Sequence, residues 1–123
     1  MSRAIAFMAG CATALALVGA RPAVAHAFLD HASPRVGAAV DQVPERVTLW
    51  FTEPLEPAFS SVKVLDASGK QVDRGDREVD PSNPAVLRVS VPRLSPGKYR
   101  VTWRVVSADA HVAHGDFTFD VKP

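Results

Sequence analysis

Apolar and polar residues alternate with a period of two along much of this chain. Side chains of a β-strand point alternately to its two faces, so this period predicts strands with one buried and one solvated face. The pattern is typical of antiparallel sheets, which commonly cover a core on one side only. Four segments carry it, and their apolar members are Val47, Leu49 and Phe51; Leu87, Val89 and Val91; Tyr99, Val101, Trp103 and Val105; and Phe117, Phe119 and Val121.

Turn-forming residues separate these segments. Clusters of Asp, Ser, Pro, Asn and Gly occupy positions 66–69, 80–84 and 95–97, and such residues favour tight turns. No helical periodicity of useful length follows residue 25. Short strands at this spacing predict an all-β fold, a β-sandwich of immunoglobulin-like architecture with about seven strands. The Cys–Trp–Cys signature of true immunoglobulin domains is absent from the sequence.

The first 25 residues have a different character. Arg3 precedes a nearly continuous apolar run over residues 4–20, and Ala23-Val24-Ala25 offers the small-x-small pattern of a signal-peptidase site. We therefore predict that residues 1–25 are a cleaved signal peptide and that residues 26–123 form one exported domain, located in the periplasm. The apolar run is close to membrane-spanning length, so a retained anchor is the alternative.

Two other processing sites lie in the same region. Cleavage after Val18-Gly19-Ala20 would leave five extra residues ahead of His26. A lipoprotein signal ending at Cys11 is disfavoured, because only a few apolar residues precede that cysteine. The choice between cleavage after Ala25 and after Ala20 stays open at the level of the sequence.

Charge and cysteine content narrow the function classes. The chain has 14 basic and 13 acidic residues; without Arg3 and Arg21, 12 basic residues face 13 acidic ones, a net charge of −1 for residues 26–123. This balance argues against binding to nucleic acid or to an anionic membrane surface. Since Cys11 is the only cysteine, the predicted domain has no disulfide and depends on its apolar core for stability.

The four histidines are the most informative polar residues. After cleavage at Ala25, His26 would come first and offer its α-amine and its ring Nδ1 to one metal ion. Asp109 and His111 form an Asp-x-His motif, and in extended backbone both side chains project from one face. Nitrogen donors with one carboxylate oxygen suit tetragonal Cu(II). The alternatives are that His26 is first by accident of cleavage and that the motif is structural.

The two remaining histidines fit a metal site less well. His114 follows His111 at an odd separation, so an extended chain sends the two rings to opposite faces. We expect His114 to be exposed, or to contact a ligand rather than the metal. His31 follows His26 at an odd separation too, and we expect an exposed or loop-capping role for it.

The mature region resembles the CopC copper-resistance family over its whole length. The residues that carry the resemblance are His26-Ala27-Phe28-Leu29, Ser33-Pro34, Leu49-Trp50-Phe51-Thr52-Glu53-Pro54-Leu55-Glu56, Ser107-Ala108-Asp109-Ala110-His111 and Gly115-Asp116-Phe117-Thr118-Phe119. The resemblance implies a Greek-key β-sandwich and a Cu(II) site made of His26, Asp109 and His111. Glu53 matches a family motif, either as a residue that supports the site or as a strand-end carboxylate.

Two departures from the family pattern change what the resemblance implies. Some members bind Cu(I) through a methionine-rich segment, but Met1 and Met8 are the only methionines here and both lie in the predicted signal peptide. We therefore expect a Cu(II)-only type. Many relatives have Gly where Ala110 stands, and Ala is tolerated there unless the backbone needs a positive φ.

These observations favour an exported, non-enzymatic copper carrier or buffer of copper homeostasis or resistance. We expect a monomer with no catalytic residue, and the resemblance implies a CopD-type inner-membrane copper transporter as its partner. A copper oxygenase with a terminal-His site is an alternative, although such a site needs an open coordination position, which Asp109 would occupy. A non-metal interaction module of the same fold is the other alternative.

Overall fold

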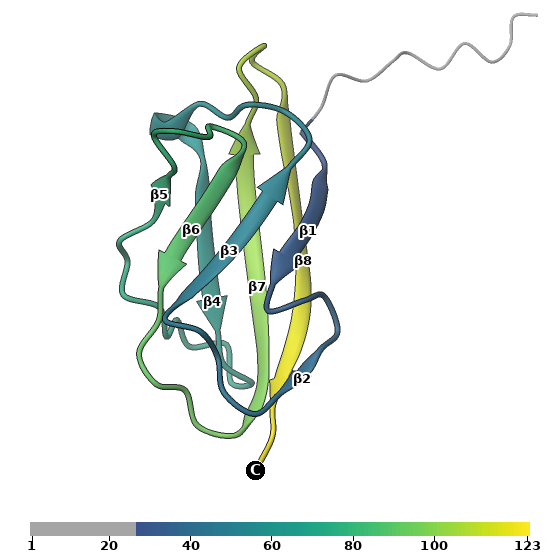
Figure 1. Ribbon diagram of the computed structural model, residues 1–123, viewed down its shortest axis with the longest axis vertical. Helices are drawn as coiled ribbons and strands as arrows, with labels where there is room; N and C mark the ends of the chain where they lie inside the picture. The colour runs from purple at the N-terminus through teal and green to yellow at the C-terminus, as the bar shows by residue number, and fades with distance from the viewer. Residues whose placement is uncertain (1–26) are drawn as a thin grey trace, which may run out of the picture.

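The structure is a computed structural model that describes residues 27–123 as two stacked β-sheets (Figure 1). The first sheet has the strand order β1-β3-β6-β5, and the second has the order β2-β8-β7-β4. Their bounds are β1 Leu29–Ser33, β2 Ala39–Val40, β3 Arg46–Phe51, β4 Ser61–Leu65, β5 Glu78–Val79, β6 Val86–Ser90, β7 Gly97–Val106 and β8 Val112–Val121.

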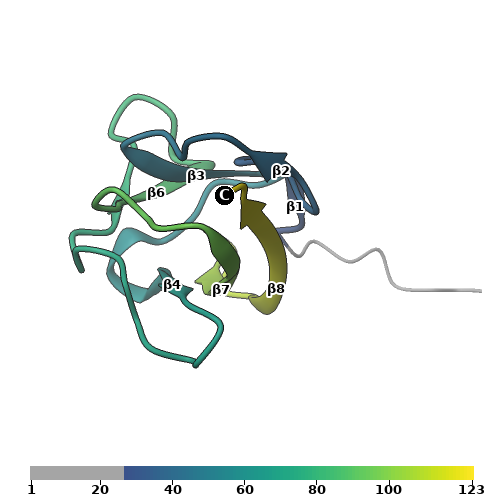
Figure 2. The ribbon, with the colours of Figure 1, turned by 90° about the horizontal axis from the view of Figure 1, so that it is seen from below.

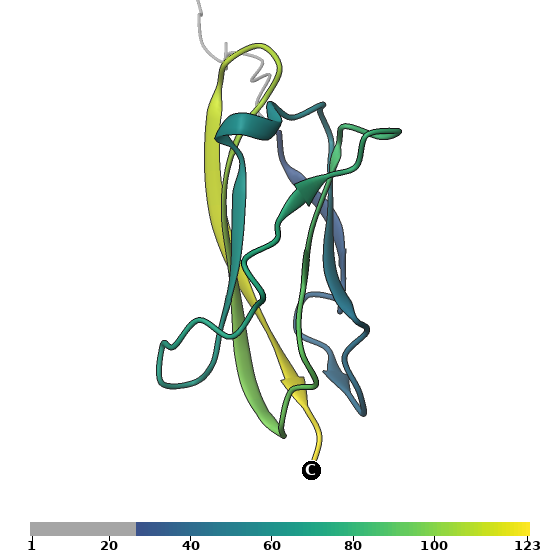
Figure 3. The ribbon, with the colours of Figure 1, turned by 90° about the vertical axis from the view of Figure 1, so that its left-hand side faces the viewer.

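The two sheets form the layers of a sandwich, which are seen from one end in Figure 2 and from the side in Figure 3. Neighbouring strands are antiparallel except for the short parallel pair β2–β8. The chain passes between the sheets after β1, β2, β3, β4 and β6, and such connections between sheets are typical of Greek-key sandwiches. The predicted β-sandwich is confirmed. The structure has eight strands rather than about seven, because β2 and β5 contain two residues each.

The core lies between the sheets, and the period-two pattern supplies it. Leu49 and Leu87 of the first sheet and Val101 and Phe119 of the second are fully buried. Tyr99 stacks on Phe119 with ring centroids 5.6 Å apart. Trp103 shares the inward face of β7 but is only partly buried. The remaining alternating apolar residues named above are all buried.

The outer faces of both sheets carry charged side chains in cross-strand pairs. On the second sheet, Arg100 pairs with Asp116 at 3.3 Å and Lys98 with Asp120 at 3.5 Å. On the first sheet, Arg88 contacts both Glu78 and Asp80. Exposed pairs of this kind contribute little stability each, so the fold depends mainly on its core.

The one helical element within residues 27–123 is the 3-10 turn η1, Pro57–Phe59. Within this part of the chain no helix has the length and apolar character needed to cross a membrane. The predicted signal peptide lies outside the described residues and stays a prediction.

Replacing Leu49 with Ala tests the assigned core. Leu49 is fully buried between the sheets, so the change should lower the free energy of unfolding by about 2 to 5 kcal/mol. Urea denaturation followed by circular dichroism measures the difference. Val36, which is 58% exposed, provides the control, and Val36→Ala should stay within about 0.5 kcal/mol of the wild type. Similar losses at both positions would contradict the assignment.

Candidate metal centre

Several loops meet at one end of the sandwich, at the top of Figure 1. The loop that follows β3 connects them. Thr52 exchanges two hydrogen bonds with Phe28: its backbone N–H donates to the Phe28 carbonyl, and its hydroxyl accepts from the Phe28 N–H, both at 2.9 Å. The Pro54 carbonyl accepts from the Ala108 N–H at 2.9 Å. This loop therefore fixes the segment ahead of β1 relative to the loop between β7 and β8.

Asp109 and His111 lie in a tight turn, not in extended backbone. The Ala110 N–H donates to the Ser107 carbonyl at 2.8 Å, and Ala110 has a positive φ of 72°. The prediction that extended backbone aligns the two side chains is therefore wrong in its geometry. The turn still brings them together, with His111 Nδ1 3.0 Å from Asp109 Oδ2. The sequence identified the pair but not the conformation that forms it.

Ser107 holds this turn from inside. Its side chain is buried, and its hydroxyl donates to Asp109 Oδ1. The same hydroxyl oxygen accepts from the His111 N–H at 3.3 Å, while the Ser107 N–H donates to the His111 carbonyl at 2.9 Å. A buried hydroxyl so engaged orients the Asp109 carboxylate and fixes the backbone of His111. Sequence reasoning missed this role, although a serine two residues before the Asp-x-His motif was the available signal.

The same contacts set the charge of Asp109. The Ser107 hydrogen bond is the largest cause that lowers the pKa of the Asp109 carboxyl; burial, the next largest, opposes it, and the hydrogen bonds and charge of His111 lower the pKa further. Hydrogen bonds to a carboxylate favour its ionised form. Both side chains are about half exposed, so an anionic oxygen and an imidazole are accessible together. This is a donor set for a cation.

His31 and His114 lie on the outer faces of the sheets. The ring of His31 on β1 stacks on Trp50, with centroids 4.4 Å apart, and its Nδ1 lies 2.6 Å from Asp30 Oδ2. His114 is exposed on β8, directly across from Arg104 of β7.

The described residues supply only part of a metal site. Glu53, in the loop after β3, is half-buried. No group of three His, Cys, Asp or Glu side chains within residues 27–123 is arranged to hold a metal ion. His26 lies outside the described residues, so its predicted part in the site stays a prediction.

Ala27, the residue that follows His26, lies at the same end of the molecule. It is buried, with 1% of its surface exposed. It lines a small hollow of about 240 Å³ whose other walls are Phe28, Leu29, Trp103, Val112, Ala113 and His114. Val112 and Ala113 directly follow the Asp-x-His turn. The first described residue is therefore anchored beside the strand that leaves the turn.

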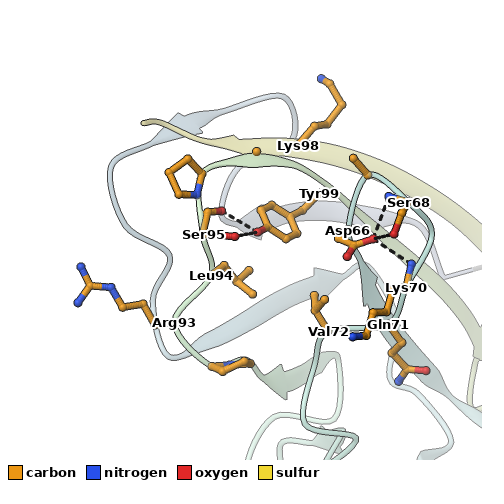
Figure 4. A pocket seen from close by; sticks show the side chains of 14 residues that line it. Asp66, Ser68, Lys70, Gln71, Val72, Arg93, Leu94, Ser95, Lys98 and Tyr99 are labelled. Carbon is orange, nitrogen blue, oxygen red and sulfur yellow. Dashed lines mark hydrogen bonds between the residues drawn. The ribbon is translucent and has the colours of Figure 1, made fainter.

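A larger hollow of about 570 Å³ lies at the opposite end, between residues 66–72 and 92–99 (Figure 4). Its polar groups are engaged in local structure. The Asp66 carboxylate accepts from the Ser68 hydroxyl and from the Ser68 and Lys70 N–H groups. The Tyr99 hydroxyl donates to the Ser95 carbonyl at 2.6 Å. These contacts stabilise the two turns and leave no converging set of donors for a ligand.

Fold and site together define a small β-sandwich with a carboxylate–imidazole pair beside its N-terminal strand. The family model for the CopC domain matches residues 29–122. Copper resistance protein C of Escherichia coli is 36% identical over 107 residues, covering 81% of this chain and 84% of that protein. The copper transport protein CutJ of Bacillus subtilis is 32% identical over 98 residues, covering 79% of this chain but 18% of that longer protein.

A solved structure agrees with these sequence matches. The crystal structure of CopC from Methylosinus trichosporium OB3b superposes with a TM-score of 0.75 at 39% identity, covering 80% of this chain and 95% of that one. The chain belongs to the CopC family. The family resemblance seen in the sequence is thereby confirmed, and with it a copper-related function.

The positive φ of Ala110 predicts that a glycine at this position stabilises the fold. At φ 72° an alanine is strained by about 1 to 2 kcal/mol, whereas a glycine is not. Glycine also gives the unfolded chain more conformational entropy, which offsets part of this gain. Ala110→Gly should therefore raise the free energy of unfolding by up to about 1 kcal/mol. Ala108, in the same turn without a positive φ, is the matched control. Ala108→Gly should instead destabilise by about 0.4 to 1 kcal/mol. Equal effects in urea denaturation would contradict the turn geometry.

Removing the Ser107 hydroxyl should raise the pKa of Asp109. The lowered folded-state pKa stabilises the fold above the unfolded-state pKa of the carboxyl, and this contribution is lost as pH falls through the folded-state value. In Ser107→Ala this pH-dependent contribution to stability should be smaller, because the hydrogen bond that is the main cause of the lowered pKa of Asp109 is gone. Carbon NMR titration of the carboxyl measures the shift. Ser68→Ala, the control, should raise the pKa of Asp66 and leave Asp109 unchanged.

Proposed function

We propose that this protein binds one Cu(II) ion through His26, Asp109 and His111. The carrying observation is that a turn held by Ser107 brings the Asp109 carboxylate and the His111 imidazole together at the end where Ala27 is buried. His26 is covalently attached to Ala27, and its α-amine and ring nitrogen would complete the donor set. An unprocessed chain would lack that α-amine, so the proposal includes cleavage after Ala25.

The donor chemistry favours Cu(II) over Cu(I). Amine and imidazole nitrogens with a carboxylate oxygen suit the tetragonal geometry of Cu(II), whereas Cu(I) prefers thiolate and thioether sulfur. The sequence contains no Cys or Met after Cys11. A mature chain of residues 26–123 would therefore offer no sulfur to a soft ion.

We further propose that the protein works in the periplasm as a copper carrier or buffer rather than as an enzyme. Asp109 would fill the coordination position that a copper oxygenase keeps open for its co-substrate. The relative CutJ is named a copper transport protein, and the matched region is a minor part of its length. The name of this relative supports a role in copper transport, and our proposal adds that the protein is a monomer that serves a membrane copper transporter of the CopD type.

Adding one Gly before His26 tests the role of the terminus. The extension converts the α-amine of His26 into a peptide nitrogen but keeps the imidazole. A donor held on the same residue acts at high effective concentration, so its loss should weaken Cu(II) binding by about 10² to 10⁴-fold. Competition titration against a chelator of known affinity measures this, after intact mass confirms the terminus of each protein.

The melting temperature of the metal-free protein provides the control for the extension. It should be nearly unchanged, since the addition lies at the chain end. Copper should raise the melting temperature of the native-terminus protein more than that of the extended one, because a ligand stabilises according to its affinity for the folded state. Equal Cu(II) affinity in both forms would overturn the terminal-histidine site.

Substitutions in the turn test the other two ligands. His111→Ala should weaken Cu(II) binding by about a hundredfold or more, because even residues that only support a ligand are worth ten- to a hundredfold. Asp109→Asn should cost less, since imidazole is the stronger Cu(II) donor. His31→Ala and His114→Ala remove histidines from the outer sheet faces and serve as controls. A larger loss in either control would contradict the assignment of the second imidazole.

A further inference from the structure

Trp103 occupies a place that only a glycine partner allows. It lies directly across from Gly115 in the β7–β8 pairing. A Cβ atom built on Gly115 would lie 2.5 Å from Cζ2 and 2.9 Å from Cη2 of the indole, closer than real Cβ contacts. The indole atoms Cε2, Cζ2 and Cη2 of Trp103 therefore lie close against the backbone of Gly115 on β8. Any side chain at position 115 would push the ring away.

The indole is also supported from within the core. Its ring meets Phe51 edge-on, with centroids 6.0 Å apart and an interplanar angle of 69°, and it lies tilted against Phe117 at 6.1 Å. Phe51 belongs to the first sheet and Phe117 to the second, so Trp103 spans the space between the two layers. Side chains with contacts on both sides have little freedom to move.

Trp103 also lines the small hollow beside Ala27, at the end of the sandwich where the Cu(II) site is proposed. Trp103 and the buried Ala27 line the same hollow, together with Val112 and Ala113 at the start of β8. The segment around Ala27 and the start of β8, which follows the Asp-x-His turn, thus both border the same hollow as the Trp103 ring. A rigid ring at this point fixes the distance between the N-terminal segment and the Asp-x-His turn, two parts of the proposed site that are far apart in sequence.

We propose that Trp103, packed closely on Gly115, is a positioning residue that directs the N-terminus towards Asp109 and His111. This proposal rests on the proposed Cu(II) site and adds a residue that does not itself bind the metal. Trp103 limits where Ala27 can lie, and Ala27 limits where the amine and ring of the preceding residue can reach. Positioning of this kind is worth about ten- to a hundredfold in metal affinity.

A double-mutant cycle separates this role from a general contribution to stability. Trp103→Leu is made in the protein that begins at His26 and in the form with one Gly added before it, and Cu(II) affinity is measured in all four. In the native-terminus pair the change should weaken binding by about ten- to a hundredfold. In the extended pair the loss should be clearly smaller, because the α-amine no longer contributes and only the ring of His26 remains to be positioned. Damage to the fold would affect both pairs alike and therefore cancels.

Two further variants test the contact itself. Gly115→Ala should weaken Cu(II) binding when Trp103 is present and cause no further loss in the Trp103→Leu background, where the ring that it would displace is gone. Trp50→Leu is the matched control, because Trp50 lies on the outer face of the first sheet against His31. It should leave the affinity and the copper spectrum unchanged in both terminal forms.

The outcomes distinguish the two proposals. If the wild-type native and extended proteins bind Cu(II) equally well, the terminal-histidine site is wrong and the role of Trp103 falls with it. If they differ, but Trp103→Leu weakens both forms equally or neither of them, only the positioning role is overturned. An unchanged electron paramagnetic resonance spectrum of the copper complex of Trp103→Leu, with unchanged affinity, would lead to the same conclusion.

Discussion

The antiparallel pairing of β7 with β8 is the constraint on which the rest of the structure depends. It runs over ten residue pairs, from Gly97–Val121 to Val106–Val112. Its inner face supplies much of the core, including Val101 and Phe119. Its closed end is the turn that holds Asp109 and His111. Because the register is fixed by burial of one face, the same pairing that builds the core also determines where the turn begins and which residue lies across from Trp103.

The turn shows how a small domain accommodates a polar site. Ala110 adopts a strained backbone conformation, and Ser107 is a buried polar residue with its hydroxyl fully engaged. Strain at such positions persists when the surrounding structure over-determines it, and here the long strands on both sides do so. Two accessible donors result, in a relative orientation that neither residue would hold alone.

The proposed site is divided between a loop and the chain terminus. Under this proposal, removal of the signal peptide creates one of the metal donors, the α-amine of His26, on the residue that also supplies an imidazole. Copper binding then depends on correct export and cleavage as much as on folding. The apolar hollow lined by Ala27 and Trp103 links these two requirements, because it is formed by the folded sandwich and receives the segment produced by cleavage.

The sequence by itself determined the β-sandwich, its core residues and its family, because period-two burial and the family motifs are local in sequence. It also selected Asp109 and His111, since few residue types bind Cu(II). Only the tertiary structure decided that these two lie in a turn with Ala110 at positive φ, that Ser107 holds this turn, and that Trp103 lies on Gly115 beside Ala27. Those features depend on register and on contacts between segments as far apart in sequence as Ala27 and Ala113, which alternation along one strand does not encode.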